Sequence, residues 1–223
     1  ITTRHGFARN NDFDLVEKGE NFLKFKFSSN EETLEKYPFE FDFFLIYTIT
    51  DNGLEIKYEV LNKTKGDMYF SLGAHPAFAL ELNDEIKLED YYLEFEKNET
   101  TQIYQLRSDA LILEEKKDYL KNEKIIKLSG TIFDNDAIIF ENLNSAKVTL
   151  KCSKSTRELS MDYSQFPFIA FWSKSKAPFV CIEPWFGISD FANCTGKLEE
   201  KKGILKLKEN DVFTAKIIIN GKL

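Results

Sequence analysis

The sequence predicts an all-β protein folded as one large antiparallel β-sandwich with few short helices. Three observations support this prediction. Apolar and polar residues alternate with period 2 along much of the chain, whereas helical periodicity is scarce. The 223 residues include 21 phenylalanines, which suit half-buried sheet surfaces. Many short strands joined by polar turns favour a sandwich or barrel over a βαβ fold. Since no repeat, low-complexity tract or linker divides the chain, a single domain over residues 1–223 is expected.

The clearest strands lie in the first third of the chain. Residues 23–27 alternate Leu, Phe and Phe with two lysines, which gives one apolar and one solvated face. Residues 41–50 are followed by Asp51-Asn52-Gly53 and by a second alternating run over residues 54–62. An Asn-Gly pair between two such runs predicts a β-hairpin.

The remaining elements are shorter. Further strands are predicted over residues 68–72, 92–95, 101–105, 125–128, 137–140, 147–152, 169–172, 179–182 and 213–219. Two helices are predicted, one over residues 31–37 behind Asn30 as a cap and one over residues 118–122.

Composition narrows the class of protein. The net charge of −7 argues against nucleic acid as a partner. No apolar run approaches the ~18 residues that span a membrane, and no signal peptide is visible. Cys152, Cys181 and Cys194 are odd in number and lack paired metal spacing, so they are expected to be reduced thiols of a cytoplasmic protein.

Three polar side chains stand in settings suited to proton transfer. The only two histidines are His5, in His5-Gly6-Phe7-Ala8-Arg9, and His75, in Gly73-Ala74-His75-Pro76-Ala77-Phe78. Glu183 lies among apolar and aromatic residues, and both His75 and Glu183 precede a proline, which favours extended backbone at strand ends or rigid turns. Imidazole and carboxylate groups fixed in this way act as acid and base, although each alone is also compatible with a structural role.

Other chemistries fit the same residues less well. Two histidines and a glutamate are a possible zinc site, but no His-Glu-x-x-His spacing supports it, so no metal is expected. There is no Gly-x-Ser-x-Gly elbow and no glycine-rich phosphate loop. Paired carboxylates for glycoside cleavage stay possible, drawn from Asp136, Asp162, Glu183 and Asp190.

Four motifs in order resemble the aldose 1-epimerase (mutarotase) family, and in particular its bacterial galactose mutarotase-like branch, encoded near sugar-utilisation genes. They are His5-Gly6-Phe7-Ala8-Arg9, Ser71 to Phe78, Phe133 to Ala137, and Trp172 with Cys181 to Trp185. The resemblance implies a large β-sandwich with a monosaccharide bound in an open cleft. Members usually carry further strands and a sugar-contacting arginine before the first motif. Only four residues precede His5 here, so some amino-terminal strands are expected to be missing.

The resemblance also implies roles in a cofactor-independent isomerase that interconverts the α and β anomers of an aldohexose. Glu183 would be the general base, His75 the general acid, and His5 an assistant at the ring oxygen or a nearby hydroxyl. Arg9 and Asp136 would position sugar hydroxyls. Trp185, Trp172 and Phe78 offer apolar faces to the sugar ring, with a place in the core as the alternative for these aromatics.

Two other functions stay open at this stage. The first is a carbohydrate-binding or sugar-sensing protein that has the same fold without turnover. The second is a hexose-phosphate mutarotase, which needs several basic groups around its cleft and is disfavoured by the few arginines. A monomer or homodimer is expected.

Overall fold

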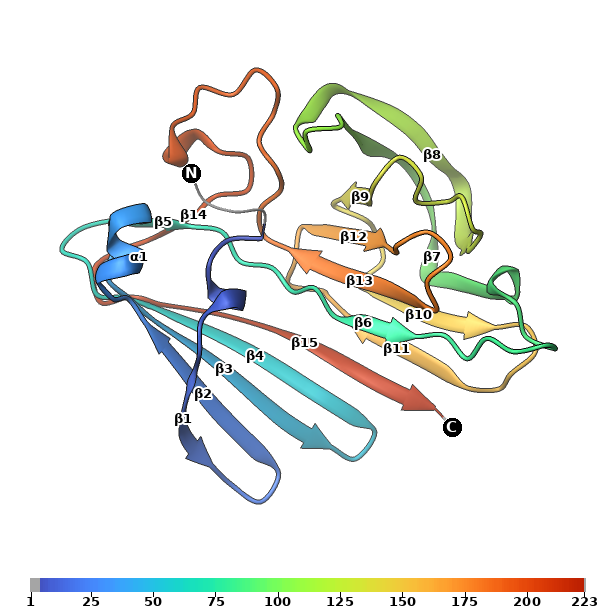
Figure 1. The fold of residues 1–223 in the computed structure, drawn as a ribbon, viewed down its shortest axis with the longest axis horizontal. Helices are drawn as coiled ribbons and strands as arrows, with labels where there is room; N and C mark the ends of the chain where they lie inside the picture. Colours follow the sequence, from blue (N-terminus) through green and yellow to red (C-terminus); the bar gives the residue numbers. More distant parts are fainter. Residues whose placement is uncertain (1–4, 223) are drawn as a thin grey trace. The chain divides into compact units, whose positions relative to one another are not determined.

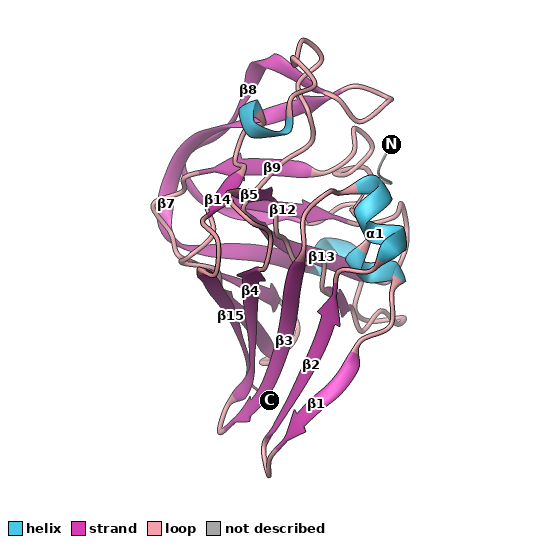
Figure 2. Ribbon diagram, turned by 90° about the vertical axis from the view of Figure 1, so that its left-hand side faces the viewer, coloured by secondary structure: helices cyan, strands magenta, loops and turns pink. Residues whose placement is uncertain are grey.

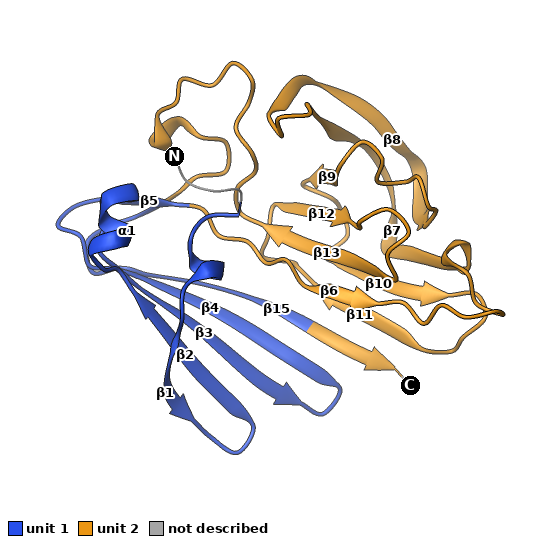
Figure 3. Cartoon of the chain, in the orientation of Figure 1, with its two compact units in different colours: residues 1–70, 206–218 blue, residues 71–205, 219–223 orange. Residues whose placement is uncertain are grey.

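The computed structural model describes residues 5–222 and consists mostly of strands, with one short α-helix (Figures 1 and 2). It divides into two compact units, the first made of residues up to 70 with 206–218 and the second of residues 71–205 with those from 219 on (Figure 3). The antiparallel all-β prediction is confirmed, whereas the single domain stays a prediction. Within residues 5–222, no helix combines the length and the apolar character that crossing a membrane requires.

The first unit contains the strongly predicted hairpin. Its main strands lie side by side in the order β1, β2, β3, β4, β15. They are Asp14–Lys18, Phe22–Ser28, Phe41–Thr50, Gly53–Asn62 and Val212–Lys222, the last ending in the second unit. β3 and β4 pair in register from Phe41↔Asn62 to Thr50↔Gly53, as the Asn-Gly signal predicts. Short strands β5 (Met68–Phe70) and β14 (Leu205–Leu207) also pair.

The predicted helix behind Asn30 is also confirmed. It is α1 (Glu31–Lys36), and its N-terminus forms a capping box. The Asn30 side chain accepts a hydrogen bond from the Thr33 N–H at 2.9 Å, and the Thr33 hydroxyl accepts one from the Asn30 N–H at 2.9 Å. Two backbone donors at the helix start are thereby satisfied.

The second unit is a sandwich of two antiparallel sheets. One has the order β6 (Ala77–Ala79), β13 (Phe179–Trp185), β12 (Phe168–Trp172), β9 (Ile138–Glu141). The other contributes to this unit the strands β11 (Glu158–Asp162), β10 (Lys147–Cys152), β7 (Tyr91–Leu106) and β8 (Ile112–Lys127), which lie side by side in this order. The short 3-10 helices are η1 (Ala8–Asn10) in the first unit and η2 (Leu88–Asp90) and η3 (Leu198–Glu200) in the second.

Aromatic side chains join the two sheets of the second unit. The ring of Phe95 on β7 lies 6.0 Å from that of Phe140 on β9 and 5.9 Å from that of Phe171 on β12. All three are fully buried. The four-stranded sheet therefore has one face in this core, which leaves its other face for the site described below.

Two sequence predictions are corrected in this unit. The helix over residues 118–122 is wrong, because these residues belong to β8, and the strands over 92–95 and 101–105 are parts of one strand, β7. The register between β7 and β8 shifts at four points, so the period-2 pattern breaks repeatedly within strands that are nevertheless continuous. The sequence also failed to predict β1, β6, β11 and β14, which are short.

Candidate active site

The carboxyl group of Glu183 is enclosed by the four-stranded sheet of the second unit. Glu183 lies on β13, which pairs with β12 on one side and with β6 on the other. Its side chain is only 2% exposed. Because side chains alternate along a strand, Cys181 and Trp185 share the face of Glu183, while Ile182 and Pro184 lie on the opposite face. Burial of an ionisable group is costly, so a carboxyl group in this position is a candidate for chemistry.

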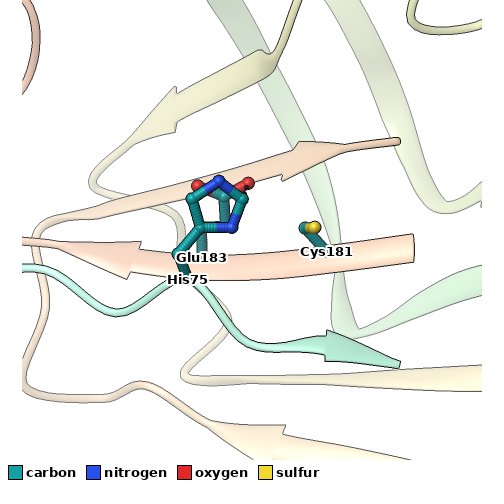
Figure 4. Close-up of side chains that lie close together, drawn as sticks. All are labelled: His75, Cys181 and Glu183. Atoms are coloured by element: carbon teal, nitrogen blue, oxygen red, sulfur yellow. Dashed lines mark ion pairs between the residues drawn. The ribbon is translucent and has the colours of Figure 1, made fainter. Parts of the chain in front are cut away.

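His75 reaches the same place from the chain that leads into β6. The Ala74 N–H donates to the Pro184 carbonyl at 3.0 Å, and the Ile182 N–H donates to the Pro76 carbonyl at 3.2 Å, so both neighbours of His75 are fixed to β13. His75 Nδ1 lies 3.4 Å from Glu183 Oε1, and the imidazole is 35% exposed. Figure 4 shows the ring next to the carboxyl group. The structure therefore joins one buried carboxyl group to one imidazole that solvent reaches.

The pKa of Glu183 is raised to about 8, because burial disfavours the charged carboxylate and the negative charge of Asp136 adds to this effect. Asp136 precedes β9, is half-buried and has a left-handed backbone with φ of 75°. Its Oδ1 accepts a hydrogen bond from the Ala137 N–H at 2.8 Å. The structure thus brings the predicted Asp136 within electrostatic range of Glu183.

Glu183→Gln is expected to stabilise the fold, increasingly so as the pH rises from about 4.5 to about 8. The folded chain keeps Glu183 protonated up to about pH 8, whereas the unfolded chain ionises near the ordinary pKa of 4.5. Between these values the unfolded state binds fewer protons, so wild-type stability falls with rising pH. At about 1.4 kcal/mol per pH unit, the variant gains up to about 3 kcal/mol at pH 7. Urea unfolding at pH 5 and pH 7.5 measures the difference.

Glu141→Gln is the matched control for this measurement. Burial by itself raises the pKa of Glu141, but hydrogen bonds from Lys202, Tyr104 and Lys116 and the charge of Lys116 hold it at about 2. The glutamine variant is therefore expected to be less stable than the wild type at pH 7.5. A gain for Glu183→Gln that is equal at both pH values would show that the folded chain ionises Glu183 at its ordinary pKa.

Both tryptophans lie on the face of Glu183. Trp172 pairs with Cys181 across β12 and β13, and its ring lies 6.3 Å from the His75 ring, edge to face. Trp185 lies opposite Gly73, and a Cβ added to Gly73 would be 2.6 Å from Trp185 Cδ1. Glycine at position 73 is therefore needed for the indole to lie against the chain that carries His75.

Phe78 is not brought to this face, contrary to the sequence-based interpretation of it as a sugar contact. It pairs with Val180 in the β6–β13 ladder. Paired residues share a face, and the Val180 side chain alternates with those of Cys181 and Glu183. Phe78 therefore lies on the opposite face of the sheet, which favours the alternative of a structural role.

His5 and Arg9 belong to the first unit. His5 has a left-handed backbone with φ of 72°, is followed by Gly6 with φ of 68°, and is exposed. Arg9 is an exposed residue of η1. Phe7, between them, packs its ring 5.9 Å from Phe41, which anchors this motif. The roles of His5 and Arg9 at a sugar site stay predictions.

Cys181 is the site residue that the sequence did not single out. Its thiol is 2% exposed, and its ligand atom lies with those of His75 and Glu183 in a group whose members are all within 4.8 Å of one another. Burial, and then the charge of Glu183, raises the pKa of the thiol to about 12. One feature of the sequence could have pointed to Cys181 as a site residue: it belongs to a predicted strand and stands two residues before Glu183.

The other candidate carboxylates lie elsewhere or have other partners. Asp162 is on β11 of the other sheet, and Asp190 forms an ion pair with Lys201 at 2.5 Å. Of these carboxylates, Asp136 is the one whose charge raises the pKa of Glu183. Of the predicted catalytic residues, the structure joins His75 and Glu183 directly.

Similarity to known proteins extends over almost the whole chain. A model of the family described as aldose 1-epimerase matches residues 2–215. The chromosomal protein LacX of Lactococcus lactis subsp. lactis is 36% identical over 211 residues, which cover 93% of this chain and 71% of LacX. The plasmid form of LacX is 35% identical over the same length.

Two solved structures resemble this chain closely. One is a galactose mutarotase related enzyme from Lactobacillus acidophilus, with a TM-score of 0.94 and 33% identity over 100% of this chain and 75% of its own. The other is a galactose mutarotase-like protein from Lactobacillus casei ATCC 334, with a TM-score of 0.92 and 30% identity over 99% of this chain and 76% of its own. These similarities cover the segments that carry His75 and Glu183.

Proposed function

This chain belongs to the aldose 1-epimerase family, an isomerase family, and we propose that it interconverts the α and β anomers of a free aldohexose without a cofactor. The observation that supports this proposal best is the separation of 3.4 Å between His75 Nδ1 and Glu183 Oε1. Ring opening of a pyranose removes a proton from the anomeric hydroxyl and adds one to the ring oxygen. Both oxygens are bonded to the same carbon, so an acid and a base that lie side by side match the reaction.

In the proposed reaction, the one proton that the pair holds moves from Glu183 to His75 when the sugar binds. The Glu183 carboxylate then accepts the proton of the anomeric hydroxyl while protonated His75 donates to the ring oxygen. The bond between the anomeric carbon and the ring oxygen breaks, and the open-chain aldehyde forms. Rotation about the adjacent carbon–carbon bond presents the other face of the aldehyde. Closure then reverses both proton transfers, so that Glu183 becomes the acid and His75 the base.

Other residues would hold the sugar. Trp172 and Trp185 share the face of Glu183 and offer apolar ring surfaces, and Asp136 would accept hydrogen bonds from sugar hydroxyls. His5 and Arg9 are proposed as further contacts on the basis of family membership. A cytoplasmic location and a monomeric or homodimeric state likewise stay predictions.

Anomer-resolved NMR or polarimetry on freshly dissolved α-glucose and α-galactose tests the proposal. Acceleration over buffer supports it, and no acceleration with folded protein contradicts it. Saturable sugar binding without acceleration would identify the chain as a carbohydrate-binding protein of the same fold. Acceleration confined to hexose phosphates would identify the second alternative.

The pH dependence of kcat/KM is expected to show a fall above about pH 8. The proposed mechanism needs one proton in the pair of His75 and Glu183, and the raised pKa of Glu183, about 8, sets the pH above which the free protein loses the proton of this carboxyl group. Activity therefore falls about tenfold per pH unit above this value. Rates from pH 6 to 10, corrected for the buffer reaction, measure the profile. A profile that rises through pH 8 would instead show that Glu183 acts only after the pair has lost its last proton.

A further inference from the structure

The thiol of Cys181 lies at the proposed catalytic pair, yet the anomer exchange does not use it. Cys181 lies two residues before Glu183 on β13, with its side chain on the same face, and it is paired with Trp172 of β12. Its sulfur, a ring nitrogen of His75 and a carboxyl oxygen of Glu183 all lie within 4.8 Å of one another. Figure 4 shows the three side chains together, from β13 and from the chain before β6.

We propose that Cys181, His75 and Glu183 form a binding site for a thiophilic divalent cation such as Zn²⁺ or Cd²⁺, and that the bound cation blocks sugar turnover. The binding part of this proposal depends only on the three side chains. The inhibition part rests on the proposed function, because the cation would occupy the same His75 and Glu183 that exchange protons with the sugar.

The geometry is close to what a tetrahedral cation requires. Metal–ligand lengths of about 2.3 Å to sulfur and about 2.0–2.2 Å to nitrogen or oxygen place the ligand atoms of tetrahedral zinc about 3.3–3.8 Å apart. The observed upper limit of 4.8 Å therefore has to shrink by about 1 Å. His75 Nδ1 already lies 3.4 Å from Glu183 Oε1, so the shortening concerns the distances to the Cys181 sulfur. It requires changes in the side-chain torsion angles of Cys181 and of His75, whose ring is 35% exposed.

The donor set selects for soft cations. A thiolate and an imidazole favour Zn²⁺ and its softer relatives, whereas Mg²⁺ and Ca²⁺ prefer sites made wholly of oxygen ligands. Cation binding releases the proton of the Cys181 thiol and the proton of the Glu183 carboxyl group to solvent. The resulting thiolate and carboxylate together carry two negative charges, which a divalent cation neutralises in a buried setting. Three protein ligands leave a fourth position on the exposed side of His75, where water or a sugar hydroxyl would bind.

Cadmium titration of the full chain tests the binding directly. Bound Cd²⁺ gives a thiolate charge-transfer absorbance in the ultraviolet, and we expect one Cd²⁺ per chain. Cys181→Ala is expected to weaken binding by at least about 100-fold, since loss of even an outer partner of a metal ligand costs about 10–100-fold. Cys194→Ser, which removes an exposed thiol, is the matched control and is expected to bind as the wild type does. Zn²⁺ is then measured by its displacement of Cd²⁺.

The same proteins are assayed for sugar turnover with and without the cation. Cd²⁺ is expected to abolish turnover in the wild type and in Cys194→Ser, while Cys181→Ala is expected to keep its own cation-free rate at cation concentrations that saturate the wild type. Circular dichroism checks that each variant is folded. Equal Cd²⁺ binding by wild type and Cys181→Ala would overturn the site, as would an absence of the charge-transfer signal in the wild type.

The two proposals fail separately. A protein that turns over sugar but does not bind Cd²⁺ overturns the metal site and leaves the proposed function intact. A protein without turnover that binds Cd²⁺ through Cys181 supports the site and contradicts the function.

Discussion

Glu183→Gln is expected to lower kcat for anomer exchange by about 10²–10⁴-fold, with a much smaller effect on sugar binding. Glutamine keeps the shape and the hydrogen-bonding capacity of the side chain but does not accept the proton of the anomeric hydroxyl. The loss arises in the chemical step, because Glu183 exchanges a proton only as the ring opens or closes. Initial rates on freshly dissolved α-glucose, followed by polarimetry over a range of sugar concentrations, separate kcat from KM.

A carboxylate outside the site provides the control for this variant. Glu158 is on β11, in the other sheet of the second unit, and Glu158→Gln is expected to retain the wild-type rate. Glu183→Gln is also expected to unfold at a higher urea concentration than the wild type at pH 7.5, because the cost of burying the carboxyl group is removed. Loss of activity with a gain in stability would separate a catalytic role from a structural one. A wild-type rate in Glu183→Gln would refute the assignment of this residue as the base.

His75→Asn is expected to cause the second large loss, again about 10²–10⁴-fold in kcat. Asparagine offers a hydrogen-bond donor of similar reach but does not carry a proton to the ring oxygen and back. The side chain is 35% exposed, so its shortening leaves no large cavity in a core. Anomer-resolved NMR measures the rate in both directions, and both directions are expected to fall equally because one transition state serves both.

The other histidine is the natural comparison for this variant. His5→Asn is expected to have a smaller effect than His75→Asn, one that falls more on KM than on kcat. The reverse order of effects, with His5 dominating kcat, would mean that His5 is the acid. Equal and small effects of both variants would contradict general acid catalysis by histidine.

The sequence predicted the fold best where the pattern is local. The hairpin of β3 and β4 and the helix behind Asn30 each depend on residues close together in the chain, and both are confirmed. The helix predicted over residues 118–122 was wrong, because the irregular pairing of β7 with β8 overrides the local preference of this charged segment. Long-range pairing of this kind leaves little trace in a single sequence.

The same limit applies to the site. The motifs identified His75 and Glu183 as candidates, but their separation of 3.4 Å depends on the ladder between β6 and β13. That ladder also decides that Cys181 joins them and that Phe78 does not, because register fixes which side chains share a face.

By itself, the sequence determined the all-β class, the local turns and caps, and the short list of residues able to move protons. The tertiary structure alone decided which of those residues meet, and it set the pKa of Glu183 at about 8 through burial and the charge of Asp136. The reason is that the alternation of apolar and polar residues in a strand depends on residues that are adjacent in the sequence. Contact and desolvation, in contrast, depend on strands that are distant in the chain and become neighbours only after folding.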